Sequence, residues 1–120
     1  MIFGKDMRVI SKLWGYEVWI YNEEYCGKIL HIQQGKRCSL HYHLEKDEVL
    51  YLVSGKMLFR HHDSVVDICS PNTNCVHEMT PGDAYHVTPG CVHQMTALED
   101  CTIFEVSTHH RDEDSIRVSL

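Results

Sequence analysis

Turn-forming segments recur along the chain, most of them about eight to twelve residues apart, and this spacing limits what the chain can fold into. They are residues 22–24, 33–35, 54–56, 70–72, 80–82, 88–90 and 98–100. Glycine, proline and asparagine in these segments favour turns. No stretch between them has the length and the 3.6-residue apolar period of an amphipathic helix. The spacing therefore predicts an all-β protein.

The stretches between the turns are rich in β-branched and aromatic residues, which favour strands. The predicted strands are residues 17–21, 27–32, 38–43, 49–53, 57–61, 84–87, 92–96 and 102–106. Because no helix connects them, we expect antiparallel strands that close into a jelly-roll barrel, which hides the sheet edges. Residues 66–76 are expected to be a loop between two halves of the barrel. The length of 120 residues, without linker or repeat, predicts one domain over residues 1–120.

Charge and hydropathy disfavour several classes of function. The chain has 11 basic and 17 acidic residues, and a net charge of −6 repels nucleic acids. No segment approaches the roughly 18 consecutive apolar residues that a membrane span needs. Residues 1–8 mix charges of both signs, unlike a secretory signal. We therefore expect a cytoplasmic protein with neither nucleic-acid nor membrane partners. The acidic and basic residues 45–47 are expected at a solvated loop tip.

The six cysteines are not spaced as a zinc finger requires, because no two of them form a Cys-x-x-Cys pair. They are Cys26, Cys38, Cys69, Cys75, Cys91 and Cys101. In a reducing compartment, free cysteines pack as small apolar side chains. We expect that role for most of them.

Histidine is unusually frequent, with ten in the chain, and four residues have the spacing of a metal site. His41 and His43 are two apart on a predicted strand, so they point to the same face. Glu48 opens the next strand, and a Pro-Gly turn places His93 at the start of another. A lone His-x-His pair is more often an ordinary surface or core feature, but together these four residues predict one bound divalent metal. Imidazole and carboxylate ligands suit zinc, manganese, iron or nickel.

The two segments that carry these residues resemble the two-part motif of the cupin family. Residues 35–55 match the first part with every spacing kept, and residues 82–93 match the second part. Thr88 and Ala97 depart from the family pattern, and neither is a predicted ligand. The resemblance implies a cupin-type double-stranded β-helix.

Further segments look like those of cupin phosphomannose isomerases and related sugar-phosphate isomerases. They are residues 14–17, 37–40, 105–106 and 113–117. One departure is His41, where the closest of these isomerases commonly carry glutamine. This narrower resemblance implies a mannose-6-phosphate isomerase-like activity on a sugar-phosphate type of substrate.

Strand alternation suggests further site residues. Arg37 and Ser39 share the face of the two ligand histidines and are predicted to bind substrate, with the arginine holding an anionic group or pairing with a surface acid. Glu105 lies in an otherwise apolar strand, where a carboxylate needs a partner or a role. His86 is a second candidate to transfer a proton.

We therefore predict a metal-dependent isomerase or epimerase of a small sugar or sugar phosphate, with Glu105 or His86 as the catalytic base. A mononuclear iron or manganese dioxygenase is an alternative, because the same ligands leave room for oxygen. A non-catalytic module that binds sugar or metal is a third possibility. The aromatic residues of the segment 14–21 suggest a homodimer contact.

Overall fold

The computed structural model describes residues 1–69 and 75–119 and consists of strands, turns and three short 3₁₀ helices. The described strands are β1 (Arg8–Lys12), β2 (Gly15–Asn22), β3 (Tyr25–Ile32), β4 (His41–His43), β5 (Glu48–Ser54), β6 (Met57–His62), β7 (Val76–Met79), β8 (Ala84–Val87), β9 (Val92–Ala97), β10 (Cys101–Thr108) and β11 (Ser115–Arg117). The 3₁₀ helices are η1 (Gly4–Asp6), η2 (Val66–Cys69) and η3 (Asp112–Asp114).

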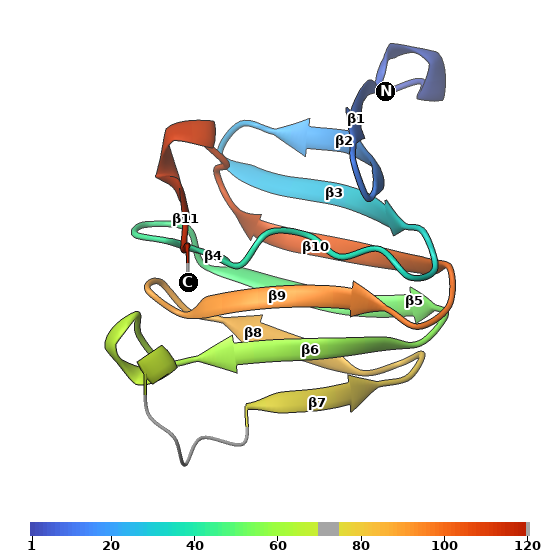
Figure 1. Cartoon of the computed structure of the whole chain (residues 1–120). Helices are drawn as coiled ribbons and strands as arrows, with labels where there is room; N and C mark the ends of the chain where they lie inside the picture. Colours follow the sequence, from blue (N-terminus) through green and yellow to red (C-terminus); the bar gives the residue numbers. More distant parts are fainter. Residues whose placement is uncertain (70–74, 120) are drawn as a thin grey trace.

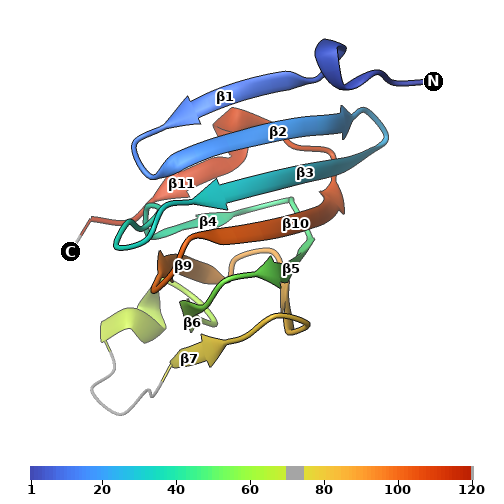
Figure 2. The same cartoon turned by 90° about the vertical axis from the view of Figure 1, so that its right-hand side faces the viewer.

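The strands form two antiparallel sheets (Figure 1). The first has the order β1-β2-β3-β10-β5-β8, and the second has the order β11-β4-β9-β6-β7. From β3 onward the chain passes repeatedly from one sheet to the other, so the two sheets face each other as a jelly roll. Figure 2 shows β1 and β2 continuing the first sheet beyond β3. The predicted all-β antiparallel barrel is confirmed.

Strand alternation decides which side chains face the interior. In β3 every second residue is buried, from Cys26 through Lys28 and Leu30 to Ile32, while the residues between them are half-buried. In β10 the buried positions are Cys101, Ile103 and Glu105. The period of two puts each set on one face of its strand. Two charged residues thus point into the barrel with the apolar ones.

Apolar side chains fill one end of the interior. Leu52, Met57, Phe59 and Ile103 have no exposed surface and belong to one cluster contributed by both sheets. The turn between β5 and β6 packs closely against this end. Gly55 has a φ of +91°, and a Cβ there would lie 2.3 Å from the carbonyl oxygen of Asp100, so this turn requires glycine.

Three strands lie outside the segments predicted from the sequence, namely β1, β7 and β11. β1 is an edge strand with mostly exposed residues, so it lacks an alternating apolar pattern. Of the predicted strand 38–43, only residues 41–43 form a strand, which is β4. Residues 38–40 are not in a strand, and the preceding Arg37 forms only an isolated bridge. Within the expected loop 66–76, η2 covers the start and β7 begins at the end, and residues 70–74 lie outside the described part.

Two other sequence predictions meet the structure in part. Cys26, Cys38, Cys91 and Cys101 are buried free thiols, as expected, whereas the Cys69 side chain lies outside the described part. The predicted dimer segment falls largely in β2, which is paired on both sides, by β1 and β3. The homodimer stays a prediction. In the part of the chain that the structure describes, no helix is long and apolar enough to cross a bilayer.

Candidate functional site

Three histidines converge inside the barrel from two neighbouring strands. His41 and His43 are on β4, and His93 on β9 is the direct cross-strand partner of His41. The ring centroid of His41 lies 4.3 Å from that of His93 and 5.1 Å from that of His43. One nitrogen of each ring lies within 4.8 Å of the other two. The structure therefore brings together the three histidines that the sequence predicts as ligands.

Backbone carbonyl groups orient all three imidazole rings. The Nδ1 atom of His41 lies 2.9 Å from the Ser39 oxygen, and that of His93 lies 3.0 Å from the Cys91 oxygen. His43 makes the corresponding contact with the Asp114 oxygen at 3.2 Å. Because a carbonyl oxygen only accepts, these contacts place the proton on Nδ1 and leave a lone pair on each Nε2. This arrangement is typical of metal-binding histidines, whose second nitrogen is held by an outer partner.

Glu48, at the start of β5, brings a carboxylate to the same point. Its Oε1 lies 3.1 Å from Nε2 of His93 and 3.9 Å from Nε2 of His43. Oxygen and nitrogen lone pairs that meet in a buried space need a cation between them or a proton. Burial, followed by the neighbouring His93 ring, lowers the pKa of His41 to about 3, so the His41 ring is neutral at pH 7. The donor set fits a divalent transition metal.

Lys46 connects Glu48 to Glu105 in the interior. Its Nζ lies 3.1 Å from Glu48 Oε2, 2.6 Å from Glu105 Oε2 and 3.0 Å from Nδ1 of His110. Burial alone lowers the pKa of Lys46, but the two carboxylates outweigh it and hold the pKa above its usual range. The prediction that residues 45–47 are a solvated loop tip is wrong for Lys46, which is 3% exposed.

Asp114, next to β11, fixes the turn that carries Lys46. Its carboxylate accepts hydrogen bonds from the backbone N–H groups of Leu44, Glu45 and Lys46. Its carbonyl oxygen is the one that contacts His43. Asp114, which is buried, therefore positions both His43 and Lys46.

Glu105 is buried beside two cations and a hydroxyl group. Ser107 donates a hydrogen bond to its Oε2 at 3.0 Å, and Lys28 is its direct cross-strand partner on β3. Burial and the nearby charge of Glu48 raise the pKa of Glu105, and the charges of Lys46 and Lys28 offset this only in part. A carboxylate with a raised pKa is a stronger base than an exposed one.

These groups lie along a cleft of about 1010 Å³. The three histidines, Glu48, Glu105, Arg37 and Ser39 all line it, so the structure brings both predicted substrate residues to the site. Five basic side chains of the lining are exposed or half-buried: Arg8, Lys12, Arg37, Arg60 and Arg117. A cleft with this rim attracts an anion although the whole chain is acidic.

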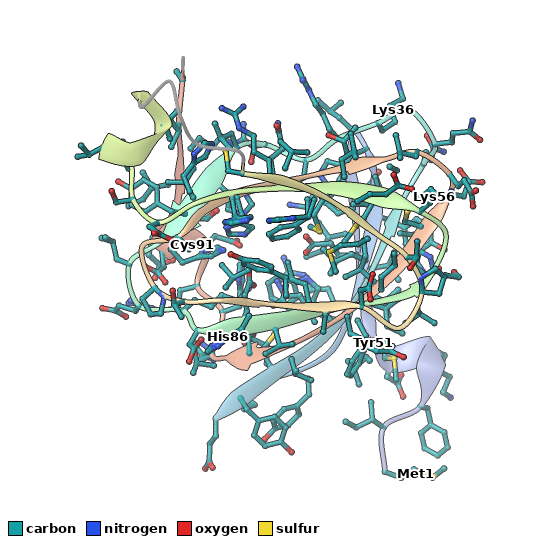
Figure 3. All side chains as sticks on the ribbon, turned by 90° about the horizontal axis from the view of Figure 1, so that it is seen from below. Met1, Lys36, Tyr51, Lys56, His86 and Cys91 are labelled. Carbon is teal, nitrogen blue, oxygen red and sulfur yellow. The ribbon has the colours of Figure 1, made fainter. Side chains whose placement is uncertain are left out.

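His86 lies outside the cleft. Tyr85 and Val87 are its more buried neighbours on β8, so strand alternation turns His86 outward. Its side chain is 59% exposed, and its Nε2 lies 2.6 Å from a carboxylate oxygen of Asp47. Figure 3 shows it on the outer side of the strand layer. The expectation that His86 lines the site is therefore corrected.

Sequence reasoning missed several residues of the cleft. Lys28 interrupts the alternating apolar face of β3, and this pattern could have predicted a buried lysine. Glu17 and Trp19, two apart on β2, face the same cleft, and their spacing is also readable. Lys46 gives no local signal, because it lies in a run of charged residues and two of its three partners, Glu105 and His110, are far along the chain.

The antiparallel jelly roll holds three histidines and Glu48 in a cleft inside the barrel. These two features define a class of small β-barrel domains with a candidate metal site in the barrel interior. The model of the Cupin domain family matches residues 28–107. The chain belongs to this family. No curated protein matches its sequence.

Several solved structures share the fold at low sequence identity. Capsular polysaccharide assembling protein CapF from Staphylococcus aureus has a TM-score of 0.78 and 15% identity, over 95% of this chain and 34% of its own. A variant of oxalate decarboxylase from Bacillus subtilis has a TM-score of 0.80 and 17% identity, over 98% and 32%. The chain thus spans about a third of either protein. KdgF from Halomonas sp. has a TM-score of 0.74 and 16% identity, over 94% and 96%.

Proposed function

We propose that this cupin is a metal-dependent enzyme that isomerises or epimerises a small sugar carrying an anionic group, such as a sugar phosphate. The observation that carries the proposal is the convergence of three Nε2 lone pairs and the Glu48 carboxylate in the cleft that also contains Glu105. His41, His43, Glu48 and His93 would hold the metal. When bound, a divalent ion there would polarise a carbonyl or hydroxyl oxygen of the substrate.

The outer part of the cleft supports the choice of an anionic substrate. Arg37 is exposed at the cleft, and Ser39 is half-buried between it and His41 in the sequence. A guanidinium group binds phosphate or carboxylate through two parallel hydrogen bonds. In this proposal Arg37 holds the anionic group, and the Ser39 hydroxyl binds substrate nearer the metal.

Glu105 is the proposed base, which removes a proton from one carbon of the substrate and returns it to the neighbouring carbon. In an epimerisation, solvent water would instead return a proton to the opposite face of the same carbon. The raised pKa of Glu105 supports its role as the base. The ammonium group of Lys46 contacts Glu105 on one side and Glu48 on the other, so it fixes both carboxylates. Isomerisation by this route needs no oxidant.

The test is hydrogen exchange with solvent. Metal-loaded protein is incubated in deuterium oxide with mannose 6-phosphate, fructose 6-phosphate and related aldose and ketose phosphates. We expect interconversion of at least one pair with deuterium at the carbon that receives the returned proton, or epimerisation with deuterium at the epimerised carbon. Oxygen consumption by iron-loaded protein, without such exchange, would instead indicate the dioxygenase. Binding without turnover would indicate a non-catalytic module.

A further inference from the structure

Two buried lysines line the cleft, and they differ in their hydrogen bonding. Lys46 has three partners within 3.1 Å of its Nζ, so its N–H groups are all used. Lys28 is 2% exposed, yet its Nζ makes no hydrogen bond to any residue of the ranges 1–69 and 75–119. Its ion pair with Glu17, at 3.6 Å, is longer than a hydrogen bond, and a buried ammonium group whose N–H groups lack hydrogen-bond acceptors is costly. Lys28 therefore has donors available to a ligand in the cleft.

The surroundings of Lys28 limit what that ligand group can be. Its Nζ lies 3.6 Å from Glu17 Oε1 and 4.1 Å from the ring centroid of Trp19. Glu105 is its direct cross-strand partner on the other side. A phosphate or carboxylate at this point would face two carboxylates at close range, which is unfavourable. An uncharged oxygen that accepts a hydrogen bond suits the position better.

Glu17 offers the complementary acceptor. Its Oε1 accepts a hydrogen bond from Trp19 Nε1 at 2.9 Å and lies nearest to Lys28. The structure gives its Oε2 no partner among the described residues, and the side chain lines the cleft at 12% exposure. A hydroxyl group is the chemical group that accepts from an amine and donates to a carboxylate at the same time.

From these contacts we infer that Lys28 and Glu17 form a subsite that binds a hydroxyl group of the substrate. The cleft then has two parts with different chemistry. Uncharged hydroxyl oxygens bind on the inner part at Lys28 and Glu17, and the anionic group binds among the basic side chains of the rim. The inference rests on the proposed function for the identity of the sugar, and it names a polyhydroxylated substrate.

The experiment measures the binding of three probes to the metal-loaded protein by calorimetry or by ligand-observed NMR. The probes are mannose, mannose 6-phosphate and inorganic phosphate. In the Lys28→Met and Glu17→Gln variants, we expect the affinity for both sugars to fall about tenfold to a hundredfold, as loss of a hydrogen bond to a charged group predicts. The affinity for inorganic phosphate and the metal content should not change.

Lys56→Met is the matched control, because Lys56 is 43% exposed and pairs with Glu78 on the surface. It should bind all three probes as the original protein does. The inference is overturned if Lys28→Met keeps full sugar affinity, if it loses phosphate binding as well, or if the original protein binds neither sugar. Sugar binding that depends on Lys28 but leads to no turnover would refute the proposed function and leave the subsite standing.

Discussion

Glu105→Gln is expected to lower the rate of solvent hydrogen exchange into the substrate by about 10²–10⁴-fold, the usual contribution of a positioned general base. The amide has nearly the shape of the carboxylate and still accepts a hydrogen bond from Lys46, so metal binding should remain. The loss should appear in kcat, with a smaller change in KM, because proton transfer is the step removed. Exchange is followed by NMR in deuterium oxide.

His86→Ala serves as the control for Glu105→Gln. His86 is the other proton carrier predicted from the sequence, and it lies on the outer surface beside Asp47. Its removal should leave the exchange rate unchanged. Unchanged exchange in Glu105→Gln, or a loss in His86→Ala of similar size, would show that the base is misassigned.

Lys46→Met is expected to lower the free energy of unfolding by about 3–5 kcal/mol, the typical cost of removing one partner from a buried ion pair. The physical reason is that Glu48 and Glu105 would stay buried without their shared cation. Urea unfolding of the metal-free protein measures the change. The effect should be smaller in metal-loaded protein, because the ion also neutralises Glu48.

Two comparisons separate this effect from the general loss of a lysine. Lys56→Met removes one partner of an exposed ion pair and should cost at most about 1 kcal/mol. In a protein that already carries Glu105→Gln, Lys46→Met should cost clearly less, since one carboxylate is gone. A cost below about 1 kcal/mol for Lys46→Met itself would contradict the buried charge cluster.

The sequence predicts the convergence of the three histidines because strand alternation decides which way each side chain points. His41 and His43 share a strand face because side chains alternate with a period of two. Glu48 and His93 could be located because each lies at the start of a predicted strand. The alternation that turns these residues inward operates within each strand. For the same reason, Arg37 and Ser39 could be assigned to the cleft before their contacts were known.

The charge cluster depends instead on residues that meet only in the folded barrel. Lys46 looks like part of a solvated turn, and its burial follows from Glu105, His110 and the three hydrogen bonds that Asp114 accepts. The error for His86 has a different cause. The turn before β8 hides its parity, which only the pairing with β5 fixes.

The most direct test of the central claim is the metal content of protein purified without chelators and without nickel affinity resin. We expect about one divalent transition metal ion per chain in the original protein and in His86→Ala. The His41→Ala, His93→Ala double variant should lose the ion, with circular dichroism confirming that it stays folded. Absence of metal from the original protein, or equal metal in the folded double variant, would contradict the assignment of this cluster as a metal site.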